Sequence, residues 1–110
     1  SQLPPILPNS ITQIDLSSNP ISELPAALIA LPRLSILECV SCNMSVVPAN
    51  LPTSLVTLHL SRNLLLKEIP NLILPLLADF NAVGCLISSI KEETFAQCPL
   101  LRFVNLDSNP

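Results

Sequence analysis

The amino-acid sequence predicts a solenoid, a fold in which short structural units repeat along the chain and stack on one another. Three observations support this class. Five similar segments recur at a nearly constant spacing, apolar and polar residues alternate within each segment, and prolines recur between the segments. A fixed period of this kind is typical of solenoids, because each unit can bury its apolar side chains only against its neighbours.

The five segments, which we call repeat blocks, begin at residues 11, 34, 55, 77 and 101, so their starts lie 23, 21, 22 and 24 residues apart. They superimpose as LxxLxLxx(N/C)x(L), and we number the positions of this pattern as places one to eleven. The blocks read ITQIDLSSNPI, LSILECVSCNM, LVTLHLSRNLL, LADFNAVGCLI and LRFVNLDSNP.

Each block is expected to contain one short strand. Apolar residues occupy the fourth and sixth places, as in Ile14 and Leu16 or Leu58 and Leu60, and they alternate with polar residues. This alternation has the period of a half-buried strand. We therefore expect the fourth and sixth places to point into the core and the third and fifth places to point outward.

The ninth place is expected to form a structural ladder. A turn at this place leaves backbone groups without partners, and a buried asparagine amide can satisfy them in its own coil and in the adjacent one. Cysteine is a small substitute that fits the same position. The ladder residues are Asn19, Cys42, Asn63, Cys85 and Asn109.

The segments between the blocks should be extended or form short 3₁₀ turns. Proline fixes φ and has no backbone N–H to donate, and it recurs in these segments at Pro25, Pro48 and Pro70. Only the segment from Lys91 to Gln97 has a composition that suits one or two helical turns.

The composition indicates one globular domain and argues against several classes of partner. The chain has 110 residues, of which 49% are hydrophobic, and a formal net charge of −3. Its longest aliphatic stretch, from Leu72 to Ala78, contains Pro75 and is far shorter than the roughly 20 apolar residues of a membrane helix. The basic residues are scattered, so we expect neither nucleic-acid binding nor membrane insertion.

The repeat blocks resemble those of the leucine-rich-repeat family over essentially the whole chain. The resemblance implies an α/β solenoid, with a curved parallel β-sheet on the concave side and mostly extended or 3₁₀ segments with little helix on the convex side. It also implies a single leucine-rich-repeat domain over residues 1–110. The subclass stays open between plant-type or intracellular scaffold repeats and the compact repeats of bacterial effector proteins. Since neither end looks capped, we expect the chain to be part of a longer repeat array.

Most members of the family are interaction scaffolds, so the outward places of the sheet are where we expect a partner to bind. Ile36, Val40 and Phe103 support this expectation, because apolar side chains on an outward face indicate a surface that a partner covers. The competing interpretation is that these places hold solvated filler, since only a minority of interface residues carry much binding energy.

We predict a partner-binding site centred on Glu38, His59 and Arg62, where cationic groups stand beside acidic ones. The full set of candidate residues is Asp15, Ile36, Glu38, Val40, His59, Arg62, Asp79, Asn81, Phe103 and Asn105.

The four cysteines are interpreted as small core residues. Cys39 and Cys42 form a C-x-x-C pair, but Cys39 takes an inward sixth place and Cys42 a ladder place, so each has a structural position. A closed zinc site needs four convergent ligands, and the sequence offers one histidine and no second C-x-x-C, so we predict no metal and no cofactor. Cys42 and Cys85 lie two repeats apart, roughly 9 to 10 Å, which is too far for a disulfide.

Reduced cysteines favour a cytoplasmic protein. The alternative is an extracellular or cell-surface protein, for which the glycosylation triplet Asn43-Met44-Ser45 argues.

The function we expect is protein–protein interaction through the concave surface, without enzymatic activity. A nucleophile needs a base, an orienting group and an oxyanion site together, and Ser61, on the same strand as His59, has no such set around it in the sequence. No small-molecule substrate is evident. Two alternatives stay open: an architectural segment of a large assembly, and the substrate-binding arm of a larger enzyme such as a ubiquitin ligase or a receptor kinase.

Overall fold

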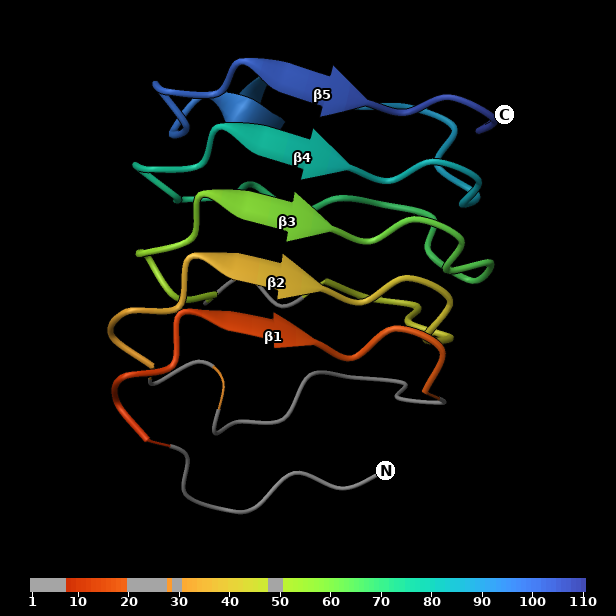
Figure 1. Cartoon of the computed structure of the whole chain (residues 1–110). Helices are drawn as coiled ribbons and strands as arrows, with labels where there is room; N and C mark the ends of the chain where they lie inside the picture. Colours follow the sequence, from red (N-terminus) through yellow and green to blue (C-terminus); the bar gives the residue numbers. More distant parts are fainter. Residues whose placement is uncertain (1–7, 20–27, 29–30, 48–50) are drawn as a thin grey trace.

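The computed structural model describes residues 8–19, 28, 31–47 and 51–110, and it shows a solenoid of stacked coils (Figure 1). Each coil contributes one short strand to a single parallel sheet, in which the strands lie in chain order. A 3₁₀ helix, η1 (Glu92–Phe95), lies in the return segment before the last strand. The predicted parallel-strand solenoid with little helix is therefore confirmed in the described residues. The strands are β1 (Gln13–Asp15), β2 (Ile36–Glu38), β3 (Thr57–His59), β4 (Asp79–Asn81) and β5 (Phe103–Asn105).

The strands pair in the register that the repeat blocks predict. The third, fourth and fifth places of each block lie opposite the same places of the next block, as in Ile14 opposite Leu37 and Leu37 opposite Leu58. The same register continues through β4 and β5. The repeats therefore differ in length only in the segments between the strands.

The core is built from the inward places. The fourth-place residues Leu37, Leu58 and Phe80 are fully buried, and so are Cys39, Leu60 and Ala82 at the sixth place. The equivalent fourth-place residue of β5, Val104, is 43% exposed, because β5 is the edge strand of the sheet. Burial of an inward side chain thus requires a coil on both sides of it.

The side chain of Asn63 ties two coils together, as the ladder prediction requires. Its amide nitrogen donates to the carbonyl oxygens of Cys39, in the preceding coil, and Leu60, in its own coil, at 2.8 and 2.7 Å. Its amide oxygen accepts the backbone N–H groups of Cys42 and Met44, both at 3.0 Å. Asn63 is fully buried, so water cannot take the place of its side chain as the hydrogen-bond partner of these four backbone groups.

Asn109 repeats most of this pattern two coils further along the solenoid. Its amide donates to the carbonyl oxygens of Ala82 and Leu106, both at 2.8 Å, and accepts the N–H of Ile87 at 3.0 Å. Asn19 donates to the carbonyl oxygen of Leu16 in its own coil at 2.9 Å.

The cysteines of the ladder reproduce only half of the asparagine pattern. The thiol of Cys42 donates to the carbonyl oxygen of Leu16 at 3.0 Å, and that of Cys85 donates to the carbonyl oxygen of Leu60 at 3.4 Å. Each of these acceptors is the sixth-place carbonyl oxygen of the preceding coil. Asn63 and Asn109 donate to the equivalent carbonyl oxygens. A thiol has no second polar atom that could accept backbone N–H groups as the amide oxygen does.

The third block departs from the other blocks after Asn63. The eleventh-place residues Met44 and Ile87 are buried in the second and fourth blocks, but in the third block Leu65 is 55% exposed and Leu66 is fully buried instead. A tight turn, closed by the bond from the Leu66 N–H to the Asn63 carbonyl oxygen at 3.0 Å, takes up the additional residue. Leu64 and Leu65 therefore face solvent.

Two parts of the predicted return segments lie outside the described residues. These are residues 20–27 and 48–50, which include Pro25 and Pro48. The helical turn expected between Lys91 and Gln97 is confirmed as η1.

Replacing Asn63 with alanine should destabilise the fold strongly. The change leaves four buried backbone groups without a partner, and each such group costs about 1 to 3 kcal/mol. We expect the free energy of unfolding, measured in urea, to fall by at least about 3 kcal/mol. Asn71→Ala is the matched control, because Asn71 is exposed and should change stability by less than about 0.5 kcal/mol. Equal effects of the two substitutions would contradict the ladder.

Candidate binding face of the sheet

The outer face of the sheet carries two adjacent rows of side chains, one from the third places and one from the fifth places. The fifth-place row contains half of the predicted site, in register across all five strands: Asp15, Glu38, His59, Asn81 and Asn105. The third-place row contains three more predicted residues, Ile36, Asp79 and Phe103. Eight of the ten candidates therefore share one face.

Val40 and Arg62 lie beyond the carboxyl ends of the strands. Val40 follows β2 by two residues, and its N–H donates to the hydroxyl oxygen of Ser17 at 3.1 Å. Arg62 occupies the eighth place, where the backbone takes a left-handed conformation with φ of 61°. Arg62, expected within the partner-binding site on the sheet, therefore lies in a turn after the strand and not on the strand itself.

This left-handed turn occurs at the eighth place of every block. The φ angles are 64° at Ser18, 59° at Ser41, 72° at Gly84 and 61° at Ser108. The conformation costs a non-glycine residue roughly 1 to 2 kcal/mol, so the turn is imposed by the coil and not by local preference. The Arg62 side chain lies close to Gly84, the eighth place of the next block, where an added Cβ atom would be 3.8 Å from the Arg62 Cγ atom.

Glu38 and His59 form the centre of the outer face. They are directly opposite each other on β2 and β3, and the Glu38 Oε2 atom lies 3.6 Å from the His59 Nδ1 atom. Among the described residues, this is the only approach of a basic to an acidic side chain within 4.0 Å. Both side chains are about one-third exposed, at 29% for Glu38 and 34% for His59, so a partner can reach them. Arg62, predicted to join them, forms no hydrogen bond or ion pair with either side chain among the described residues.

Two candidates at the ends of the fifth-place row have local structural contacts. The Asp15 carboxylate accepts the Ser17 N–H at 2.9 Å, and the Asn105 amide oxygen accepts the Asp107 N–H at 3.1 Å. The hydrogen bonds with Ser17 lower the pKa of the Asp15 carboxyl below its usual value. Both side chains thus cap the strand end in the manner of an Asx-turn, in addition to any contact with a partner.

Phe103 is the most exposed apolar side chain of the face. It is 60% exposed on the edge strand β5, and the guanidinium carbon of Arg102 lies 5.4 Å from the centre of its ring. An aromatic ring with an adjacent cation is a common anchor in protein interfaces.

The serine beside His59 has a structural hydrogen bond. The Ser61 hydroxyl oxygen accepts the Val83 N–H at 3.1 Å, as the Ser17 hydroxyl does for Val40 two coils earlier. No hydrogen bond joins Ser61 to His59 in the part of the chain that is described. The sequence predicts Ser61 on the same strand as His59, but β3 ends at His59 and Ser61 lies two residues beyond it, where its hydroxyl supports the adjacent coil.

The C-x-x-C pair lies in the core. Cys39 and Cys42 are fully buried, and all four cysteines are free thiols. Burial raises the pKa of the Cys39 thiol, and the adjacent Cys42 thiol raises it further. Burial also raises the pKa of Cys85. Such thiols resist ionisation and are poor nucleophiles.

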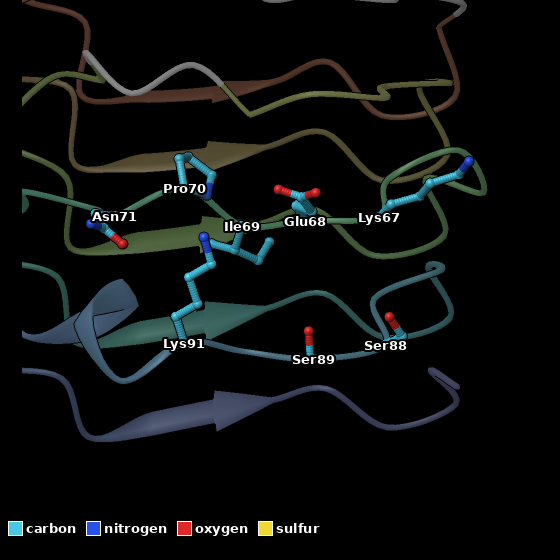
Figure 2. A pocket seen from close by; sticks show the side chains of 8 residues that line it. All are labelled: Lys67, Glu68, Ile69, Pro70, Asn71, Ser88, Ser89 and Lys91. Atoms are coloured by element: carbon cyan, nitrogen blue, oxygen red, sulfur yellow. The ribbon is translucent and has the colours of Figure 1, made fainter.

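A hollow that the sequence did not predict lies on the opposite side of the solenoid from the sheet (Figure 2). It consists of two adjoining hollows, one of about 490 Å³ and one of about 350 Å³, which share Lys67, Glu68 and Pro70. We call the pair the return groove. The unequal spacing of the third and fourth repeats is the only trace of it in the sequence.

No family model matches the chain, and no curated protein matches its sequence. No helix in the described residues is long and apolar enough to cross a membrane.

The thiols should make stability depend on pH in the alkaline range. Because the pKa values of Cys39 and Cys85 are raised in the folded state, folding is favoured while these thiols stay protonated. This contribution is complete below the unfolded thiol pKa of about 8.5 and is lost as the pH rises above it. Urea unfolding at about pH 8 and pH 9.5 should show a decrease in unfolding free energy. The double variant Cys39→Ala, Cys85→Ala should show a smaller decrease, and an identical decrease would refute the assignment.

Proposed function

We propose that this chain is a leucine-rich-repeat module that binds a protein partner through the outer face of its sheet, which would be the concave face. The repeat blocks, the parallel coils and the asparagine ladder are all typical of that family. The proposed role is a non-enzymatic scaffold for recognition.

The observation that carries the proposal is the pair of in-register rows on a stiff sheet. Backbone pairing fixes the relative positions of the side chains, so little conformational freedom is lost when a partner binds. Several side chains on the rows are also uncommitted. The carboxylate of Asp79 and the amide of Asn81 make no hydrogen bond with other described residues, which leaves them available to a partner.

The rows combine an acidic and an apolar character. Glu38 and Asp79 supply carboxylates, while Ile36 and Phe103 supply apolar contact area. A partner that fits would offer an apolar patch flanked by basic side chains. We expect Glu38, His59 and Phe103 to carry most of the binding energy, because anchors of this kind usually dominate an interface.

We also propose a cytoplasmic location. Four buried free thiols suit a reducing compartment, and an extracellular location remains the alternative.

The test compares partner capture by the full chain with capture by the triple variant Glu38→Ala, His59→Ala, Phe103→Ala. The affinity of the captured partner, measured by calorimetry, should fall at least about 30-fold, which corresponds to about 2 kcal/mol. The control variant Glu92→Ala, Gln97→Ala changes exposed residues of the η1 region and should keep the affinity of the unmodified chain. Unchanged affinity in the triple variant, with native circular dichroism, would refute the outer-face site.

A further inference from the structure

The turns that follow the strands form one rim of the solenoid, on the right in Figure 1. This rim contains a hollow of about 360 Å³, which we call the rim hollow. Its lining residues lie beyond the ends of the strands and are not shared with the return groove. They come from the second, third and fourth coils and are Ser41, Asn43, Arg62, Leu64 and Gly84.

The rim hollow forms where three residues depart from the repeat. The eighth place holds serine in the first, second and fifth blocks, but it holds Arg62 in the third block and Gly84 in the fourth. Because Gly84 has no side chain, the space beside the Arg62 stem stays open, and a Cβ atom added there would lie 3.8 Å from the Arg62 Cγ atom. The additional residue of the third block leaves Leu64 65% exposed. These three departures line one hollow.

The polar side chains of the rim hollow have no partner within the described structure. The Arg62 guanidinium makes no hydrogen bond with a described residue and has no described carboxylate within 4.0 Å. The Ser41 hydroxyl and the Asn43 side-chain amide likewise make no hydrogen bond with described residues. No described aspartate or glutamate lines the hollow. The lining thus offers one cation and two neutral donors to an anionic group, and no negative charge opposes it.

The lining also selects an apolar group close to the anion. A guanidinium binds a carboxylate through two parallel hydrogen bonds, and Leu64 gains stability when an apolar side chain covers it. Arg62 and Leu64 are two positions apart on one coil and line the same small hollow. A ligand that satisfies both must therefore carry a carboxylate and an apolar side chain close together.

The last residue of a protein chain has this combination on one Cα atom. Within an extended chain, neighbouring side chains point to opposite sides, and the nearest two on the same side lie about 7 Å apart. An acidic side chain and an apolar side chain in mid-chain are therefore farther apart than the two groups of a terminal residue. A terminal residue also has no following chain that must leave the hollow.

We propose that the rim hollow binds the C-terminal residue of a partner protein, and that this residue has a leucine-like side chain. The terminal carboxylate pairs with the Arg62 guanidinium, Ser41 and Asn43 supply further donors, and the apolar side chain covers Leu64. Capture of a terminal carboxylate by donors of loops and turns is a recurring mode of peptide recognition. The site is independent of the proposed outer-face function, because it uses none of the residues of the outer-face triple variant.

The test adds three peptides to the isotope-labelled full chain and follows the signals of Arg62 and Gly84 by NMR. The first peptide is acetyl-Gly-Ser-Ser-Leu with a free terminal carboxylate, the second is the same peptide amidated, and the third is amidated acetyl-Gly-Ser-Asp-Leu. The first should bind with a Kd of about 0.1 to 1 mM. Both amidated peptides should bind at least about tenfold more weakly, because they lack the terminal carboxylate. Equal affinity of the aspartate peptide would overturn the proposal.

Two arginine variants separate the site from the net charge. Arg62→Gln should weaken the free-acid peptide at least about tenfold, because the charged half of the bidentate pair is lost. Arg33→Gln removes the same charge at an exposed residue outside the hollow and should leave the affinity unchanged, as should the outer-face triple variant. Equal losses in the two arginine variants, or no binding of the free-acid peptide at about 10 mM, would contradict the proposed site.

The apolar contact is tested by a peptide that ends in alanine in place of leucine. The unmodified chain should bind it at least about threefold more weakly than the leucine peptide. In Leu64→Ser this preference should disappear, while the fold is kept because Leu64 is exposed. A preference for leucine that persists in Leu64→Ser would show that the side chain binds elsewhere and would overturn the proposal.

Discussion

The buried amide of Asn63 is the contact on which the rest of the solenoid depends. A coil that turns inside the core must leave backbone groups there, and these groups cannot reach water. One asparagine side chain satisfies four of them, two on its donor side and two on its acceptor side. Because its partners lie in two coils, the amide holds the coils in one register. The rows on the outer face follow from that register, since each strand begins at the same height relative to the ladder.

The same constraint decides where the molecule can vary. The ladder and the strands fix the backbone of each coil at these two places. A longer repeat must therefore accommodate its additional residues in the turns and return segments. In the third block the additional residue turns Leu64 and Leu65 toward solvent. Between the two hydrogen bonds that join the return segments of the third and fourth coils, the fourth coil has 94−86=8 residue steps and the third has 72−66=6, so the longer segment bows outward. The groove of that segment is therefore a consequence of unequal repeat length, with Lys67 and Lys91 at its borders.

Patterns that repeat in every block could be predicted from the sequence, and features peculiar to one coil could not. The ladder places, the inward fourth and sixth places and the row from Asp15 to Asn105 follow from the period alone. The period says nothing of conformations that the coil imposes against local preference, so the left-handed turn at Arg62 could not be predicted. The return groove also escaped prediction, because it depends on the difference between two neighbouring return segments. Thiol burial was predictable from the inward places of Cys39 and Cys42.

The most direct test of the ladder is amide hydrogen exchange, measured by NMR on the full chain. If the Asn63 side chain binds the preceding coil, the N–H groups of Cys42 and Met44 should exchange as slowly as the strand amides. In Asn63→Asp, which keeps an acceptor oxygen but loses the donors to Cys39 and Leu60, the protection should fall across the whole sheet. Exchange of the Cys42 and Met44 amides at the rate of an unfolded peptide in the unmodified chain would contradict the account.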